Sequence, residues 1–372
     1  MKTGTITFHA PNNNGSFLQA YALQNVLESQ LHIDNEIIDF YSEQQARQYS
    51  VFRKPHSAGD IGRNLVSLLH YKGLEKRLQR FDDIRKKYLK LTKRCTVSDE
   101  VYDVVSKYDT VICGSDQIWN TEARDYSDVY FMTGTKKRKI SYAASFGSHV
   151  ESINKQKVKN NISDFSSIAV REEAGKNLLN DVLPEKEVSV VCDPTLLLDK
   201  SFYDKLISTS YNIKEPYIFL YTINYNEEIL NVAQELSQKL KMPVYAAFTG
   251  YSCVKCKKYG IKVLYDVAPS EFLWLVEHAT YTCSNSFHGI VFSIIFEKQF
   301  CRPTKVDESG NFVKDDRIDG ILTQVGLDDR IVTNDGKCVD IIKQPINYKM
   351  AKPKLDKIRK NAIEYLKIAL LG

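Results

Sequence analysis

Short apolar segments that end in Gly, Ser, Asn or Asp and run into amphipathic segments recur along this chain, and this alternation constrains its fold most. The first example is a strand at Thr3–Phe8, a polar loop, a helix at Phe17–Leu31 and a strand at Glu36–Phe40. Strand, loop, helix and strand in this order open a doubly wound α/β fold. Four more strands are predicted before residue 199, at Tyr108–Cys113, Lys139–Ala144, Ser167–Val170 and Val188–Val191.

A second series begins after a polar connection at Asp199–Glu215. Its predicted elements are Tyr217–Thr222, Glu227–Leu240, Val244–Phe248, Ile261–Tyr265 and Tyr281–Cys283. Because 372 residues exceed one ordinary core, we predict two Rossmann-like βα domains facing a cleft. The expected domains are residues 1–198 and 199–345, and a terminal helix within 346–372 is expected to pack back on the first domain.

The stretch Tyr281–Pro303 carries the strongest candidate site. A strand runs through the polar turn Ser284–Ser286 into a second helix that opens at His288 and Gly289. Such a turn presents free N–H groups and a positive helix end, which suit an anion. Gly289 would let a ligand approach the backbone, and His288 can transfer a proton near neutral pH. The alternative is a helix-capping histidine packed under a loop.

Polar residues also follow the strands of the first domain. The loop Asn12–Gly15 lacks the GxGxxG spacing of a dinucleotide site, but Asn13 and Asn14 can offer amides to sugar hydroxyls or to an anion. An ordinary Asn/Gly turn is the alternative. Asp116 belongs to a similar Gly/Ser/Asp cluster after the strand at Tyr108–Cys113.

Three further residues of the first domain are candidates. Trp119 would either stack on a sugar or fill the core. His149 follows a strand end, and Arg171 would bind a phosphate or carboxylate bidentately or form a surface ion pair with a neighbouring glutamate.

Composition excludes several classes of protein. A net charge of +5 is mild, so it permits an anionic substrate or an acidic membrane surface and does not indicate nucleic acid as a partner. No apolar run approaches the ~20 residues of a transmembrane helix and the first residues do not form a signal peptide, so we expect a cytoplasmic protein with eight reduced cysteines. Cys253 and Cys256 form a lone CxxC, interpreted as structural rather than as a metal site. The basic helix expected at Gly73–Arg94 is interpreted as a solvated helix, with an acidic membrane surface as the alternative.

The chain resembles the polysaccharide pyruvyl transferase family. The matching segments, from about Asn12 to Pro303, are NNNGSFLQAYAL, GSDQIW, SYAASFG, VREE, CDPTLLL and SNSFHG. The resemblance implies a GT-B-like fold and transfer of a pyruvyl group from phosphoenolpyruvate to a sugar as a ketal. Phosphoenolpyruvate would be a co-substrate, and no cofactor or metal is implied.

The resemblance also implies roles for individual residues. His288 and Arg171 would be catalytic, and the donor site would contain Arg171, Ser286, His288, Gly289 and Arg317. The acceptor site, on the first domain, would contain Asn13, Asn14, Asp116, Trp119 and His149. The chain departs from the family's Arg-x-His motif, because Ser286 stands at the arginine position. The replacement cations considered are Lys139, Arg302 and Arg317.

The implied setting is exopolysaccharide or capsule biosynthesis, in which a lipid-linked acceptor would bring the protein to the inner face of the membrane. Two alternatives remain open. One is a GT-B-type glycosyltransferase using a nucleotide sugar, with Glu297 near the position of a ribose-binding glutamate. The other is a non-catalytic saccharide-binding relative.

Overall fold

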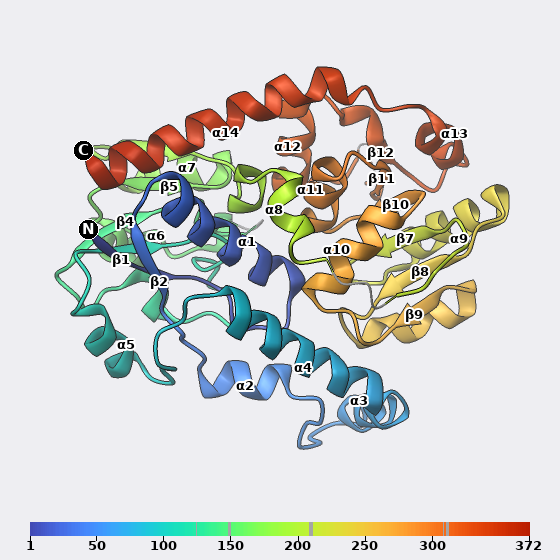
Figure 1. Ribbon diagram of the computed structural model, residues 1–372, viewed down its shortest axis with the longest axis horizontal. Coiled ribbons are helices and arrows are strands. Elements are labelled where there is room, and N and C mark those ends of the chain that lie inside the picture. The colour runs from blue at the N-terminus through green and yellow to red at the C-terminus, as the bar shows by residue number, and fades with distance from the viewer. Residues whose placement is uncertain (124, 148–149, 208–210, 308, 310–311) are drawn as a thin grey trace. The chain divides into compact units, whose positions relative to one another are not determined.

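The computed structural model describes residues 1–123, 125–147, 150–207, 211–307, 309 and 312–372, which form two compact units (Figure 1). The first unit comprises Met1–Ser50, Asp83–Leu198 and Asp356–Gly372, and the second comprises Val51–Asp82 and Asp199–Leu355. This division differs from the expected domains in one place, because the segment Val51–Asp82 belongs with the second unit. The last part of the terminal helix, Asp356–Gly372, belongs with the first unit.

The first unit contains a parallel sheet with the strand order β2-β1-β3-β4. Its strands are β1 (Lys2–Ile6), β2 (Asp34–Ile37), β3 (Thr110–Cys113) and β4 (Arg138–Ser141). Ile6 pairs with Cys113, and Cys113 pairs with Ser141, so the carboxyl ends of β1, β3 and β4 are level. A second parallel pair is formed by β5 (Ile168–Val170) and β6 (Val188–Val190). Isolated bridges link this pair to β4 and the segment after it, from Ile140 to Ser167 and from Ala144 to Val170.

The helices of this unit are α1 (Asn14–Asn25) with a π-helical turn η1 (Val26–Gln30), α2 (Glu43–Tyr49), α5 (Ser98–Val105), α6 (Lys155–Ile162) and α7 (Glu173–Val182). Its 3-10 helices are η2 (Asp128–Phe131), η3 (Val150–Ser152) and η4 (Pro194–Leu197). Two long helices, α4 (Tyr71–Tyr88) and α14 (Tyr348–Leu371), each have residues in both units.

The second unit contains a parallel sheet with the strand order β12-β11-β10-β7-β8-β9. Its strands are β7 (Ile218–Tyr221), β8 (Val244–Ala247), β9 (Lys262–Leu264), β10 (Tyr281–Ser284), β11 (Gln299–Pro303) and β12 (Ile331–Val332). Its helices are α3 (Ala58–Leu69), α8 (Lys200–Asp204), α9 (Glu227–Leu240), α10 (Pro269–His278), α11 (Phe287–Ile295), α12 (Asp316–Val325) and α13 (Cys338–Lys343), with 3-10 helices η5 (Tyr251–Tyr259) and η6 (Asp328–Arg330). Parallel sheets flanked by helices in both units confirm the predicted α/β class.

Each sheet has a point where its strand order reverses. In the first unit, β2 and β3 lie on opposite sides of β1, and in the second, β8 and β10 lie on opposite sides of β7. Ligands of doubly wound folds bind beyond the carboxyl ends of the strands at such points. The topology therefore favours the loops after β1 and β3 in one unit, and after β7 and β10 in the other.

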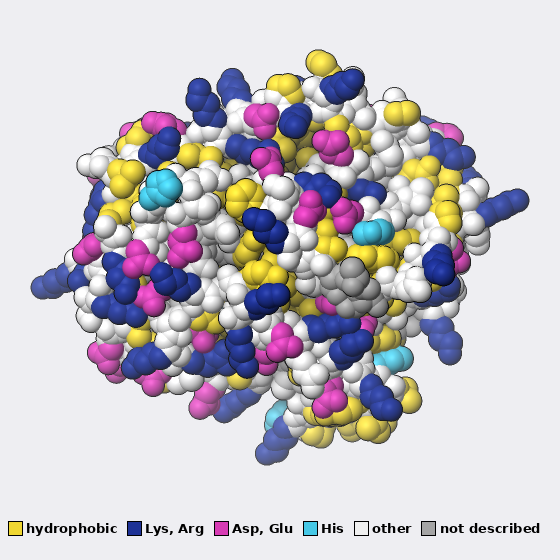
Figure 2. All heavy atoms as spheres, in the orientation of Figure 1, with side chains coloured by type: hydrophobic (Ala, Val, Ile, Leu, Met, Phe, Trp, Pro, Cys, Tyr) yellow, Lys and Arg dark blue, Asp and Glu magenta, His cyan; other side chains and the backbone are white. Residues whose placement is uncertain are grey.

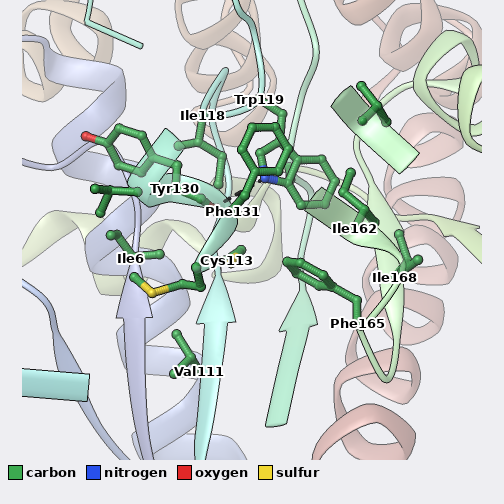
Figure 3. Close-up of a cluster of buried hydrophobic side chains, with 14 of the residues drawn as sticks. Ile6, Val111, Cys113, Ile118, Trp119, Tyr130, Phe131, Ile162, Phe165 and Ile168 are labelled. Atoms are coloured by element: carbon green, nitrogen blue, oxygen red, sulfur yellow. Dashed lines mark hydrogen bonds between the residues drawn. The ribbon is translucent and has the colours of Figure 1, made fainter. Parts of the chain in front are cut away.

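The core of the first unit is centred on Trp119, which has no exposed surface. Its ring stacks on Phe131 with centroids 5.5 Å apart and meets Phe165 edge-on at 5.7 Å. Figure 3 shows these side chains with Ile6 and Val111 in one apolar cluster. This cluster joins residues of β1 and β3 to the aromatic side chains that follow β3 in sequence.

Two helices differ from expectation. No helix is predicted from the sequence at Glu43–Tyr49, yet α2 forms because Ser42 and Gln45 make a capping box. The buried amide of Gln45 then donates to the Tyr130 hydroxyl at 3.0 Å. The sequence prediction also missed α3, whose orientation is described below.

The last part of α14 packs on the first unit. The Tyr365 hydroxyl donates to the Ser141 carbonyl at 2.8 Å, and the Arg359 guanidinium donates to the Leu198 carbonyl at 3.1 Å. These bonds satisfy carbonyl groups at the end of β4 and after η4.

Candidate functional site

The polar turn Ser284–Ser286 lies at the point of strand reversal in the second unit. The Ser284 hydroxyl donates to the Tyr221 carbonyl at 2.5 Å and accepts from the Ser286 N–H at 3.1 Å. One buried hydroxyl therefore ties the end of β10 to the end of β7 and sets the entry into α11.

His288 lies in the first turn of α11, and 9% of its surface is exposed. Its ring meets the Phe287 ring edge-on, with centroids 5.2 Å apart. Ser286 is the N-cap, and within the described residues its side chain makes no capping hydrogen bond. His288 is therefore a residue of the helix and not its cap, and the positive helix end beside it has the character that an anion site requires.

Gly289 has a packing role that was not predicted from the sequence. A Cβ atom at this position would lie 2.1 Å from Ser284 Oγ and 3.1 Å from Tyr221 Cδ1. The missing side chain lets α11 pack closely on β10 and β7. Close approach of a ligand to the Gly289 backbone stays a prediction beside this packing role.

Arg302 is the cation at the carboxyl edge beside this turn. It follows Cys301, which pairs with Cys283, so its backbone is level with Ser284. Its side chain is 4% exposed, and Nη2 lies 3.3 Å from Asp319 Oδ1. Within the described residues its Nε has no hydrogen-bond partner. Burial lowers the pKa of Arg302, although Asp319 and Asp315 oppose this shift.

Arg317, the expected donor-binding arginine, is already held by a carboxylate. Its Nε donates to Asp315 Oδ1 at 3.0 Å, and its Nη2 donates to Asp315 Oδ2 at 2.7 Å. Burial would raise the pKa of Asp315, but the hydrogen bond and charge of Arg317 hold it below its usual range. Arg302 is thus better placed than Arg317 to bind an added anion.

Asp116 occupies the corresponding edge of the first unit. Its φ of 73° is left-handed, a conformation in which Asp is enriched and in which strain often marks a functional position. Its Oδ2 accepts from the Ser16 hydroxyl at 2.8 Å, and its Oδ1 accepts from the Gln117 N–H at 2.9 Å. The half-buried carboxylate thereby joins the loop after β3 to the first turn of α1.

The expected anion clamp, Arg171, is a buried member of an ion-pair network. Its Nε donates to Glu172 Oε1 at 2.7 Å, and its Nη1 donates to Asp193 Oδ2 at 3.0 Å. The side chain is 4% exposed. Because two carboxylates already surround this guanidinium, it is poorly suited to bind a phosphate as well. This arrangement argues against Arg171 as a donor clamp. It supports the alternative of an ion pair with a neighbouring glutamate, Glu172, although the pair is buried and does not lie at the surface.

Asp193 organises this part of the first unit. It accepts hydrogen bonds from the Ser115 hydroxyl at 3.1 Å and from the Thr195 hydroxyl at 2.7 Å, in addition to Arg171. Asp193, which lies in the segment CDPTLLL, is not among the site residues predicted from the sequence. The sequence feature that could have indicated it is an Asp followed by a Pro just after a predicted strand.

The asparagine loop is held by structural bonds. Asn13 caps α1, because its Oδ1 accepts from the Gly15 N–H at 2.9 Å, and Asn14 is buried. Arg85 donates to Asn12 Oδ1 at 2.6 Å and to the Pro11 carbonyl at 3.0 Å. The structure therefore supports the alternative of an ordinary Asn turn.

Two other predictions need correction, and one falls outside the description. Trp119 has no face for a sugar, because its ring is enclosed in the core. The Lys139 ammonium is buried within β4, pairs with Asp164 at 2.5 Å and donates to the Met132 carbonyl, so it does not replace the missing arginine. His149 lies outside the described residues.

The family of the chain follows from its sequence profile. The profile described as polysaccharide pyruvyl transferase matches residues 13–302, which contain both polar strand edges described above. The chain belongs to the polysaccharide pyruvyl transferase family. It is therefore a transferase, and the predicted family is confirmed. No curated protein matches the chain in a sequence search.

Several solved structures are similar to this chain, and at their low sequence identity they are informative about its fold alone. UDP-GlcNAc 2-epimerase from Methanocaldococcus jannaschii is 13% identical, with a TM-score of 0.52 and full coverage of both chains. S. aureus MnaA, solved with UDP, is 10% identical with a TM-score of 0.54, and the alignment covers 99% of this chain and 96% of that one. These similarities confirm the predicted GT-B-like two-domain fold. None of the described helices combines the length and apolar character needed to cross a bilayer.

Proposed function

We propose that this protein transfers the pyruvyl group of phosphoenolpyruvate to two hydroxyls of a saccharide, forming a cyclic ketal. The observation that carries the proposal is the edge of the second sheet. Ser286 and His288 follow β10, and Arg302 lies near the end of the adjacent strand β11. Within the described residues the Ser286 side chain does not cap α11, so the start of this helix lies beside an imidazole and a guanidinium. A helix end, a proton donor and a cation are the groups that an anionic enol phosphate requires.

Each donor group has a proposed partner. The first turn of α11 would bind the phosphate, and Arg302 would bind the carboxylate through the guanidinium donor that lacks a partner among the described residues. Arg302 would thereby replace the arginine that the family places at Ser286. His288 would protonate the methylene carbon.

The chemistry balances without an oxidant or reductant. Protonation of C3 makes C2 electrophilic, and the first hydroxyl oxygen bonds to C2 and loses its proton. The C2–O bond to phosphate then breaks, and the second hydroxyl closes the ring at C2 with loss of its proton. The two hydroxyls release two protons. One balances the proton added to C3, which becomes a methyl group, and the other is bound by the released phosphate as hydrogen phosphate.

The first unit would bind the acceptor. Asp116 is partly exposed at the point of strand reversal, and a carboxylate can accept hydrogen bonds from sugar hydroxyls and take a proton from one. We propose Asp116 as a residue that binds a hydroxyl of the acceptor. Arg171 and Asp193 would position the surrounding loops.

The biological setting remains part of the proposal. A pyruvylated saccharide fits exopolysaccharide or capsule synthesis, with a lipid-linked acceptor as one form of substrate. Phosphoenolpyruvate as donor would place the reaction in the cytoplasm. The same step needs no further cofactor.

Calorimetric titration of the full chain with phosphoenolpyruvate tests the donor site. We expect saturable binding that Arg302→Ala weakens by about tenfold or more, as for a lost charge-assisted contact. The control Arg47→Ala removes an exposed arginine of α2 and should bind normally. Placing arginine at the family position, Ser286→Arg, should restore binding to Arg302→Ala.

A titration with a nucleotide sugar tests the alternative of a GT-B-type glycosyltransferase. Glu297 follows the carboxyl end of α11, about 13 Å along the helix from His288, so it does not support a ribose contact at this turn. Binding of UDP-GlcNAc without binding of phosphoenolpyruvate would overturn the proposed donor.

A further inference from the structure

Helix α3 presents its apolar side chains to solvent. Ile61, Leu65, Leu68 and Leu69 are between 55% and 79% exposed. At 100° per residue they lie on one face of the helix. Figure 2 shows hydrophobic side chains gathered at the lower edge of the view, where Figure 1 labels α3, with Lys and Arg side chains beside them.

The polar face of α3 is the one that packs on the protein. The Ser67 hydroxyl is buried, donates to the Val51 carbonyl at 2.8 Å and lies 2.6 Å from the Tyr251 hydroxyl. The Asn64 amide forms two hydrogen bonds with the Arg53 backbone, at 2.8 and 3.0 Å. Arg63 lies 4.6 Å from the Tyr251 ring centroid. These contacts orient α3 opposite to an ordinary surface helix, which buries its apolar face.

Neighbouring residues enlarge the apolar surface. Phe52 and Tyr71 are 45% and 40% exposed, and their rings stack with centroids 5.9 Å apart. An open hollow of about 500 Å³ adjoins this apolar surface. It lies between Tyr265 and the junction of α3 with α4. Contiguous exposed apolar surface of this kind marks an interaction site.

The surrounding charge identifies the partner. The segment from Val51 to Lys76 has five Lys and Arg residues against two Asp and Glu residues. Lys54 and Lys72 are exposed beside the apolar face. Apolar residues bordered by cations complement an anionic lipid surface. A symmetric contact with a second copy would instead bring two basic rims together.

We propose that α3, with Phe52 and Tyr71, is a membrane-docking surface whose apolar face inserts into the interfacial layer of a bilayer containing anionic lipid. This inference does not depend on the pyruvyl transfer proposed above. It differs from the membrane alternative for the basic helix α4, because α3 supplies the apolar face and the flanking cations supply the charge.

Vesicle flotation of the full chain tests the proposal. We expect the protein to float with phosphatidylcholine vesicles containing about a third phosphatidylglycerol, and to bind less at high ionic strength. Leu68→Ser with Leu69→Ser should reduce the partition coefficient about tenfold or more. The control, Ile368→Ser with Leu371→Ser, removes comparably exposed residues of α14 and should float like the wild type.

A charge-reversal pair tests the role of the rim. Lys54→Glu with Lys72→Glu should abolish the preference for phosphatidylglycerol, whereas Lys360→Glu with Lys367→Glu on α14 should retain it. All of these side chains are exposed, so thermal melting should stay unchanged and exclude misfolding. Failure of the wild type to float, or equal loss in the α14 control, would overturn the proposal. A dimer that Leu68→Ser with Leu69→Ser dissociates, without vesicle binding, would assign the face to a second copy.

Discussion

The Oγ atom of Ser284 lies 2.1 Å from the position that a Cβ atom on Gly289 would occupy. The hydroxyl is held there by the Tyr221 carbonyl and the Ser286 N–H. The close approach of α11 to β10 therefore depends on the absence of a side chain at residue 289.

Replacing Gly289 with alanine should destabilise the second unit by about 1–3 kcal/mol, because a well-packed contact has no room for a methyl group. Urea unfolding measures the change. Ser284→Gly in the same chain should recover part of the loss, and a purely additive double variant would contradict the contact.

His288→Asn should lower the turnover number about 10²–10⁴-fold, because asparagine cannot donate the proton. Phosphoenolpyruvate affinity should change much less. The measurement is phosphate release in the presence of a saccharide that the enzyme accepts. His278→Asn in α10, whose imidazole bonds only to its own helix among the described residues, serves as the control. Equal turnover for His288→Asn and wild type would remove His288 from the chemistry.

Asp116→Asn should raise the acceptor KM about tenfold, since a neutral amide accepts hydrogen bonds from sugar hydroxyls less strongly than a carboxylate does. Asparagine tolerates the left-handed backbone at this position, but its single amide oxygen can accept from only one of Ser16 and Gln117, so we expect a loss of stability of about 1 kcal/mol. Asp103→Asn, an exposed change in α5, is the matched control. An acceptor KM equal to that of the wild type would remove Asp116 from the acceptor site.

Arg171→Met should lower the free energy of unfolding by about 3–5 kcal/mol, because it leaves Glu172 and Asp193 buried without their cation. Adding Glu172→Gln should recover part of this loss. Chemical denaturation reports both effects. A variant that unfolds like the wild type and yet loses phosphoenolpyruvate binding would restore Arg171 as the donor clamp.

Asp39→Asn should destabilise the first unit at neutral pH by about 1–3 kcal/mol. Burial alone would raise the pKa of Asp39, but hydrogen bonds and charges from His9 and Arg94 hold it below its usual value. A lowered folded pKa contributes stability above the unfolded value of about 3.9 and loses it as the pH falls through the folded pKa. The difference in melting temperature between Asp39→Asn and wild type should therefore shrink below about pH 4. A difference that persists there would refute the linkage, and Asp103→Asn should show none at either pH.

The sequence predicted the elements that carry clear periodicity. The predicted bounds Glu227–Leu240 are those of α9. It failed at α2, whose stability comes from a capping box and one buried amide rather than from an apolar face. At α3 the apolar spacing was present, but no pattern in one chain tells whether such a face is buried.

The sequence predicted which loops carry the candidate site, but not the hydrogen bonds and ion pairs that their side chains form. Strand ends rich in Ser, Asn and Asp placed Ser286, His288 and Asp116 at the edges of the sheets. The ion pair that neutralises Arg171 could not be predicted from the sequence. Asp193 lies 22 residues further along the chain and comes close to Arg171 only because β5 pairs with β6. The same holds for Trp119, whose aromatic neighbours come from separate elements.

The chain leaves the first unit after Ser50, returns at Asp83, leaves again after Leu198 and returns at Asp356. Two of these passages fall inside continuous helices, α4 and α14. No single cut in the coding sequence therefore yields either unit whole. A gene fragment that stops near residue 198 would encode α3 without the Tyr251 on which its polar face rests, and would lack the closing turns of α14 that cover the end of β4.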